Sequence, residues 1–235
     1  MTLLASDLVL REGGVPVQLA ASPGRVNRLR VPEGGDPHEL GHVLAGRRRP
    51  FSGELVVDGL LLPEQREAVN RKATFIELGR RDGPAGPVDE EVRAAAHLAT
   101  LSMWRRRAFV ERTFETIDEL TAAATAEPTV HAPGEADGND ASVDAAIVEA
   151  SLAIAGGATV IVMTGTEHLT GVGERDRAES LAVELARRGV TVIVLGGERD
   201  RSYRSYRSPE TQRAGRRFGS SRGAQQQGAG RMSDE

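Results

Sequence analysis

The amino-acid sequence predicts an α/β fold with an N-terminal β region, a parallel core sheet and a helical insert. Short apolar segments separated by glycine turns in the first third indicate the β region. Helical periodicity over about 88–127 indicates the insert. Toward the C-terminus, helices alternate with strands that are apolar at every position. This pattern is typical of a parallel sheet covered by helices on both faces.

The β region is followed by a well-marked helix start. Asp36 can cap this helix, Pro37 suits its first position, and Glu39 stands three residues after the cap, as in a capping box. Gly46 is a suitable stop. We expect strands over residues 3–10, 15–20, 26–31 and 55–57.

The second half predicts a helical insert followed by alternating elements. Pro87 and the acidic residues after it mark the start of the insert, which a linker rich in proline and glycine follows over 128–142. We then expect a helix over 143–154, a buried strand over 159–163, a helix over 175–188 and a second buried strand over 190–195.

The sequence predicts one domain over 1–198 and a basic tail over 199–235. The tail contains nine arginines against four acidic residues and little that can be buried, so we expect it to be disordered. The chain has no cysteine, which excludes disulfides and thiolate metal sites. No apolar run approaches the roughly 20 residues that span a bilayer, and no secretory signal is apparent. We therefore expect a cytoplasmic protein.

Four blocks of sequence resemble one known family in the same order. The run LAGRRRPFSGELVVDG over residues 44–59 is similar to the segment after the phosphate loop of ABC transporter ATP-binding subunits. Pro23-Gly24 resembles the turn before that loop's strand. Residues 158–163 resemble the Walker B strand, and residues 189–194 the strand before the switch histidine. The resemblance covers about 3–198 and implies an ABC-type P-loop NTPase-like domain.

The phosphate loop that this resemblance implies lacks the residues that bind phosphate. A Walker A motif needs backbone amides that cradle phosphate and a lysine that holds the β and γ oxygens. Pro37 stands at the lysine position, and the only lysine of the chain is Lys72. Three nearby acids oppose polyphosphate: Glu33, Asp36 and Glu39. We expect no bound cofactor at the vestigial loop, formed by Gly34, Gly35, Asp36, Pro37 and His38.

The other motifs of the family are replaced as well. The Walker B strand runs into Met163-Thr164-Gly165 instead of an Asp-Glu pair, and Glu77 stands where the metal-linking loop has glutamine. Residues 138–142 do not resemble the signature, and Gly197 stands at the switch histidine. The resemblance therefore implies a chain with no catalytic residue and no metal ligand, which is not expected to hydrolyse ATP.

A rival motif begins in the same loop. His38-Glu39-Leu40-Gly41-His42 matches H-E-x-x-H, which predicts a zinc-dependent hydrolase with two histidine ligands and Glu39 as base. The alternative is that Glu39 caps the helix and both histidines are ordinary helix residues. The extended form of the zinc motif also needs a glycine and a third histidine, where this chain has Ala45 and Arg48.

The resulting hypothesis is a catalytically inactive subunit that is a structural or regulatory partner of an integral membrane transporter subunit. It would lie on the inner face of the membrane and pair with itself or with an ABC ATPase, without nucleic acid. In this family the helical insert faces the membrane subunit, which makes Trp104, Arg105, Arg106 and Arg107 candidate contacts; a solvated basic helix end is the alternative. A soluble regulatory scaffold derived from an ATPase is the third hypothesis. The tail is either a solubilising end or a contact with anionic lipid or RNA.

Overall fold

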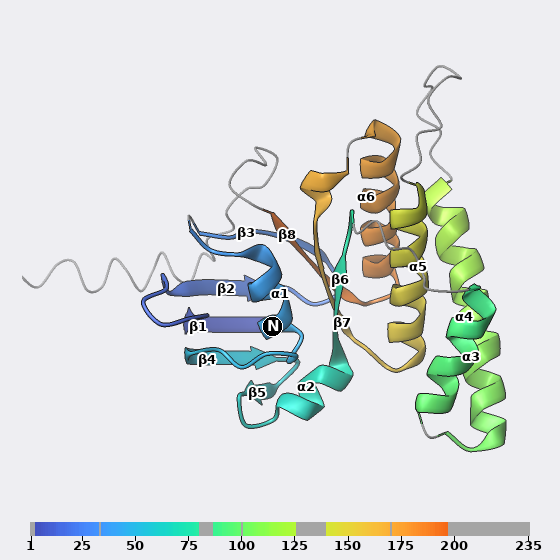
Figure 1. Cartoon of the computed structure of the whole chain (residues 1–235), viewed down its shortest axis with the longest axis horizontal. Coiled ribbons are helices and arrows are strands. Elements are labelled where there is room, and N and C mark those ends of the chain that lie inside the picture. Colours follow the sequence, from blue (N-terminus) through green and yellow to red (C-terminus); the bar gives the residue numbers. More distant parts are fainter. Residues whose placement is uncertain are drawn as a thin grey trace, which may run out of the picture. The chain divides into compact units, whose positions relative to one another are not determined.

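The computed structural model describes residues 3–32, 34–79, 87–99, 101–125, 140–169 and 171–196 (Figure 1). It contains two four-stranded sheets, one antiparallel and one parallel, and several helices that pack on the parallel sheet. Within the described residues, no helix combines the length and the hydrophobicity that a membrane crossing requires.

The antiparallel sheet has the strand order β2-β1-β4-β5. Its strands are β1 (Leu3–Val9), β2 (Val17–Ala21), β4 (Ser52–Val57) and β5 (Leu60–Leu62). Leu3 pairs with Ala21 on one side and with Val57 on the other, and all three are buried. This sheet is the predicted N-terminal β region.

The parallel sheet has the strand order β3-β8-β7-β6. Its strands are β3 (Val26–Arg30), β6 (Ala73–Glu77), β7 (Val160–Thr164) and β8 (Thr191–Gly196). Every residue of the two central strands, β7 and β8, is buried. The continuous apolar runs therefore predicted the core of the sheet correctly, because helices cover both of its faces.

The helices lie on both faces of the parallel sheet. Helix α1 (Pro37–Leu44) packs on one face and shares a core with the antiparallel sheet. Helices α5 (Asp140–Ala155) and α6 (Val172–Arg187) cover the other face (Figure 1). Helix α4 (Met103–Thr125) packs against α5 and α6, and α3 (Val88–Leu98) packs against α4. A short helix, α2 (Arg66–Lys72), and a 3-10 turn, Thr166–His168, complete the described elements.

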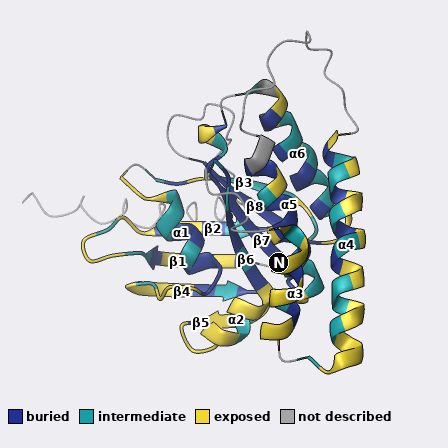
Figure 2. Ribbon diagram, turned by 45° about the vertical axis from the view of Figure 1, so that its right-hand side comes forward, coloured by how far each residue is buried: buried dark blue, intermediate teal, exposed yellow. Residues whose placement is uncertain are grey.

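Two apolar cores result from this arrangement. In β7, Val160 and Val162 join the core shared with α1 and the antiparallel sheet, whereas Ile161 and Met163 join the core beneath α4, α5 and α6. Figure 2 shows the buried residues along the strands and the exposed ones on the outer faces of the helices. Successive residues of one strand thus stabilise opposite sides of the domain.

Two short elements and several element boundaries differ from the prediction. Strand β5 and helix α2 were not predicted, because runs of three and seven residues are too short to show a clear periodicity. Helix α5 begins at Asp140, inside the stretch that we expected to be linker. The rest of that linker, 128–139, and the tail, 199–235, lie outside the described residues.

Candidate functional site

The loop between β3 and α1 occupies the position of the predicted phosphate loop. Gly35 donates its backbone N–H to Pro32 O at 2.9 Å, and the N–H of His38 is donated to Asp36 Oδ1 at 2.9 Å. Pro37 is the first residue of α1 and has no N–H. At these three positions, therefore, no amide remains to face a phosphate group.

The start of α1 already holds an anion of its own. Asp36 is the N-cap, as predicted, and its carboxylate lies where the positive end of the helix dipole attracts negative charge. A phosphate at this helix terminus would compete with that carboxylate for the same amides and the same field. The capping contact stabilises the helix while weakening it as an anion site.

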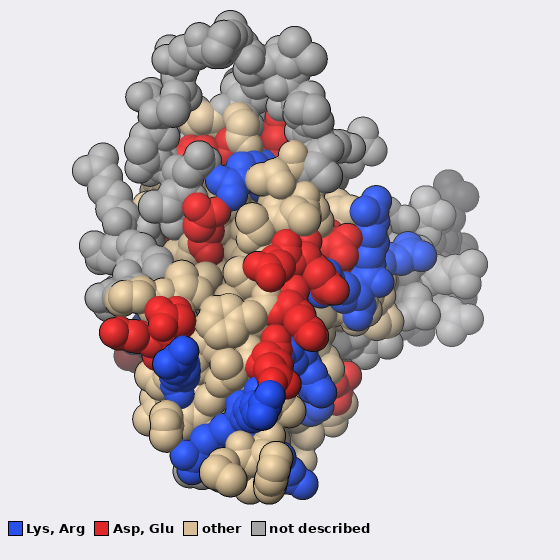
Figure 3. Space-filling view, turned by 90° about the vertical axis from the view of Figure 1, so that its right-hand side faces the viewer, with Lys and Arg blue, Asp and Glu red and all other residues tan. Residues whose placement is uncertain are grey.

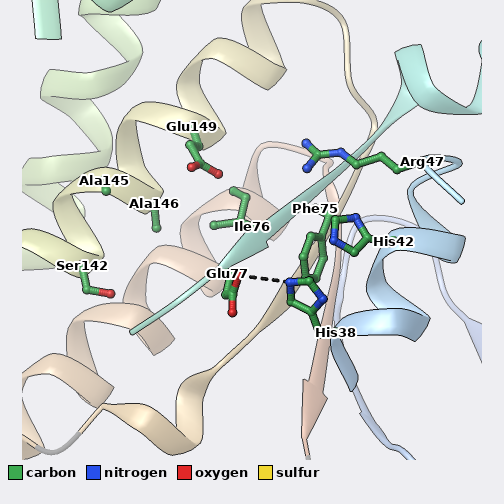
Figure 4. A pocket seen from close by; sticks show the side chains of 10 residues that line it. All are labelled: His38, His42, Arg47, Phe75, Ile76, Glu77, Ser142, Ala145, Ala146 and Glu149. Carbon is green, nitrogen blue, oxygen red and sulfur yellow. Dashed lines mark hydrogen bonds and ion pairs between the residues drawn. The ribbon is translucent and has the colours of Figure 1, made fainter. Parts of the chain in front are cut away.

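Glu77, at the end of β6, pairs with α1. Its Oε2 atom lies 3.2 Å from Nε2 of His38, and both side chains are partly exposed (Figure 4). The residue at the family's metal-linking position is therefore held by the helix that follows the loop. Sequence reasoning noted Glu77 as a substitution but did not foresee this partner, which stands 39 residues earlier.

A pocket of about 420 Å³ opens between α1, β6 and α5. His38 and His42 line one wall, with Phe75 between them and the sheet, and α5 forms the opposite wall (Figure 4). The lining residues are His38, His42, Arg47, Phe75, Ile76, Glu77, Ser142, Ala145, Ala146 and Glu149. The pocket brings together charges of both signs over an aromatic floor.

His42 is shaped by this packing. Its ring lies 4.7 Å from the ring of Phe75, centroid to centroid. Burial lowers the pKa of His42 below its usual value, and the positive charges of His38 and Arg47 lower this pKa further. Gly41 makes the contact possible, because a Cβ atom there would lie 2.1 Å from Cε2 of Phe75.

At the end of β7, where the sequence predicted the Walker B position, the chain makes a tight glycine turn. After β7 the chain turns at Gly165, which has a φ of 85°. A Cβ atom at Gly165 would lie 2.0 Å from the carbonyl oxygen of Leu78, so no side chain fits there. Nearby, Ser142 accepts a hydrogen bond from Gly79 N at 2.6 Å; it is the one residue of 138–142 whose side chain the structure describes.

The H-E-x-x-H segment is divided between two surroundings. His38 and His42 lie on one face of α1 with ring centroids 4.5 Å apart. Glu39 instead pairs with Arg48 at 3.1 Å, because the turn at Gly46 returns the chain toward α1. In this pair the Glu39 side chain faces Arg48 and not the N-cap amide that the predicted capping box requires. Within the described part of the chain, no three His, Cys, Asp or Glu side chains form a group that can hold a metal.

The candidate partner-binding residues lie together in the first turns of α4. Trp104 and Arg105 are exposed, and Arg107 pairs with Glu111 at 2.8 Å. Arg106 is held differently, because its Nε donates to Leu101 O at 2.8 Å and its Nη1 lies 3.1 Å from Nδ1 of His97. The structure thus brings these four residues to one corner of the insert, remote in sequence from the pocket.

Comparisons with known proteins match the fold. No family model and no curated protein matches the chain. CbiO1 from Clostridium perfringens, part of the ABC transporter complex CbiONQ, aligns with TM-score 0.61 and 13% identity over 84% of this chain and 78% of that one. A putative ABC transporter ATP-binding protein from Pyrococcus furiosus gives 0.56 and 15% identity over 86% and 94% of the two chains.

A third solved structure agrees with these two. The bacterial ABC transporter cassette MJ0796, solved as a dimer in a post-hydrolysis state with ADP and Pi, gives a TM-score of 0.56 at 13% identity. The alignment covers 84% of this chain and 88% of that one. At such identities the likeness shows the fold alone. The chain has the ABC ATPase-like fold that the sequence predicted.

Proposed function

We propose that this chain is a non-hydrolysing member of the ABC ATPase group that acts as a structural or regulatory partner of an integral membrane protein. It would lie at the inner face of the cell membrane and associate with a second copy of itself or with an active ABC ATPase. The observation that carries this proposal is the start of α1, where Asp36 and Pro37 occupy the positions that a phosphate loop needs for amides and a lysine.

The chemistry of the other positions supports the same conclusion. ATP hydrolysis requires a metal held by protein ligands and a residue that orients the attacking water. Met163, Thr164 and Gly165 offer no carboxylate at the predicted end of the Walker B strand, and Glu77 is engaged by His38. The residues present therefore do not fit Mg-ATP.

The zinc-hydrolase alternative receives less support. A zincin base must reach the metal-bound water beside the two histidines. Glu39 faces Arg48 instead, and the acid beside His38 is Glu77. A helix whose glutamate is paired elsewhere is better explained as a structural element.

For the contact with the membrane protein, we propose Trp104, Arg105, Arg106 and Arg107. Trp104 is largely exposed, and tryptophan and arginine are the residue types that contribute most to protein interfaces. The basic, aromatic corner of α4 therefore provides a surface for association, while the domain behind it is held by its own core.

Co-purification from detergent-solubilised membranes tests this proposal. The wild-type chain is expected to retain one integral membrane protein in a stoichiometric amount, and the variant Trp104→Ser/Arg105→Gln is expected to retain at least five- to tenfold less, as loss of a hot-spot pair predicts. Glu39→Gln is the control and is expected to behave as wild type. If Glu39→Gln abolishes retention of the membrane protein while Trp104→Ser/Arg105→Gln retains as much as wild type, the function lies in the H-E-x-x-H segment and the proposal is wrong.

A further inference from the structure

The most exposed large apolar side chains of the described structure gather where α3 meets α4. Leu98, Met103 and Trp104 have exposed fractions of 83%, 74% and 76%, whereas no other large apolar residue in the described ranges exceeds 60%. Together with Arg105 and Arg107 these residues are called the insert corner. Exposed apolar side chains are ordinary when scattered singly, but a cluster of this kind marks a surface that meets another phase or partner.

The arginines of the insert corner are not explained by the stability of the helix. They stand in the first turns of α4, where the helix dipole favours negative charge, and the first turn contains no acidic residue. Arg107 is compensated by Glu111, but the described structure gives Arg105 no partner. Cations at this end of a helix cost stability, so an interaction with an anion outside the chain is the natural reason for them.

Arg106 connects the two helix ends that form the insert corner. Arg106 bonds to Leu101 O and to His97, which ties the beginning of α4 to the end of α3. Leu98 ends α3, and Met103 and Trp104 begin α4, so these side chains project from two helix ends that Arg106 connects. Residues that project in this way can insert into a surface that the corner touches.

The charges of α4 change sign along the helix. Basic residues dominate its beginning, where the nearest acid, Glu111, is paired with Arg107, and further acidic residues follow from Glu115 through Glu119. Figure 3, which faces this side of the molecule, shows blue among tan at the lower end and a red band above it. Eleven residues of helix, from Trp104 to Glu115, correspond to about 17 Å at 1.5 Å per residue. That separation is about twice the Debye length at physiological salt, so the acids would not repel a surface that the corner touches.

We propose that the insert corner binds directly to an anionic lipid surface. Trp104, Met103 and Leu98 enter the boundary between headgroups and acyl chains, and Arg105 and Arg107 meet the lipid phosphates. Tryptophan is favoured at this depth because its ring is apolar and its N–H is polar. This inference rests on the proposed function in that both place the corner at a membrane, and it adds the lipid around the membrane protein as a second contact of the same corner.

The chain contains a single tryptophan, Trp104, which makes its fluorescence a direct probe of the corner. The full chain is mixed with phosphatidylcholine vesicles containing phosphatidylserine, and with vesicles of phosphatidylcholine alone. With the anionic vesicles we expect a blue shift of the emission and quenching by brominated lipid. With the neutral vesicles we expect neither change. Raising the salt to about 0.5 M reverses the binding, because the attraction is screened.

Two variants separate the contributions. Arg105→Gln/Arg107→Gln is expected to lower the affinity for anionic vesicles about 25-fold, since each cation near such a surface contributes about 1 kcal/mol. Leu98→Ser/Met103→Ser, which keeps the probe, is expected to lower it at least tenfold through lost apolar insertion. Phe51→Ser, an exposed aromatic outside the insert, is the matched control and is expected to bind as wild type.

Two results would overturn the inference. Vesicle binding without any change in Trp104 emission would mean that another part of the chain, such as the arginine-rich segment 199–235, makes the contact. No vesicle binding, together with corner-dependent retention of a membrane protein in detergent, would make the corner a protein-docking surface. That second result would leave the proposed function intact. If the chain instead binds lipid but retains no membrane protein in detergent, the membrane-protein partner is rejected and the lipid contact stands.

Discussion

The interior of the parallel sheet and the loops at its carboxyl edge differ in how closely their residues match those expected of an ABC ATPase-like domain. Strands β7 and β8 are buried throughout, with apolar side chains on both faces. The turns that follow β3, β6 and β7 have Asp36 and Pro37, Glu77, and Gly165 at the places where we propose that the nucleotide and metal ligands of an ABC cassette are missing. The ABC ATPase-like fold depends on the buried apolar area, whereas the proposed loss of phosphate chemistry concerns the exposed edge alone.

This difference shows that the two properties have separate physical sources. Burial of apolar side chains supplies most of the stabilisation of a domain. Ligands for phosphate and metal are polar groups at an exposed edge, and they contribute little to that sum. The proposed absence of nucleotide ligands is therefore compatible with the same fold.

The sharpest contrast is expected between a core residue and an edge residue. Ile161→Ala removes a fully buried side chain and is expected to lower the free energy of unfolding by about 2–5 kcal/mol. His38→Ala breaks a partly exposed contact with Glu77 and is expected to cost less than about 1 kcal/mol. Urea unfolding followed by circular dichroism measures both. Equal losses would mean that the edge is part of the stabilising structure.

Gly41→Ala tests the closest packing between α1 and the sheet. The added methyl group would clash with Phe75, so we expect a loss of about 1–3 kcal/mol even though alanine favours helices more than glycine does. The double variant Gly41→Ala/Phe75→Leu should recover part of that loss, because the shorter side chain leaves room. A stabilised Gly41→Ala protein, measured by thermal unfolding, would contradict this packing.

Asp36 tests the cap at the start of α1. Asp36→Ala is expected to destabilise the chain by about 0.5–2 kcal/mol, because the N–H of His38 loses its acceptor. Asp36→Asn keeps an oxygen at the same place and should cost almost nothing. If both variants unfold at the same denaturant concentration as wild type, the carboxylate does not stabilise the helix terminus.

The smallest effect concerns pH. The pKa of His42 is lower in the folded chain than its usual value of 6.5, so the unfolded chain binds the proton more readily. The associated stability is fully present above about pH 6.5 and is lost as the pH falls toward the lowered pKa. His42→Phe should flatten the dependence of the unfolding midpoint on pH below about pH 6.5, relative to wild type. A variant with an unchanged profile would show that other groups cause it.

Sequence reasoning succeeded where the determinant is local. The start of α1 at Asp36-Pro37 and the buried strands could be predicted because caps and apolar runs act within a few residues. The pairing of His38 with Glu77 could not, since it depends on how α1 lies against β6. Glu39 shows the same limit, because its partner Arg48 becomes available only after the turn at Gly46.

We propose that this fold does not process nucleotide, and titration calorimetry with Mg-ATP tests the proposal most directly. On the full chain, with turnover measured on the same sample, we expect no saturable binding tighter than millimolar and no phosphate release above background. Pro37→Lys should behave identically, because one restored residue leaves the other roles empty. Micromolar binding, or turnover that persists through purification, would contradict the account.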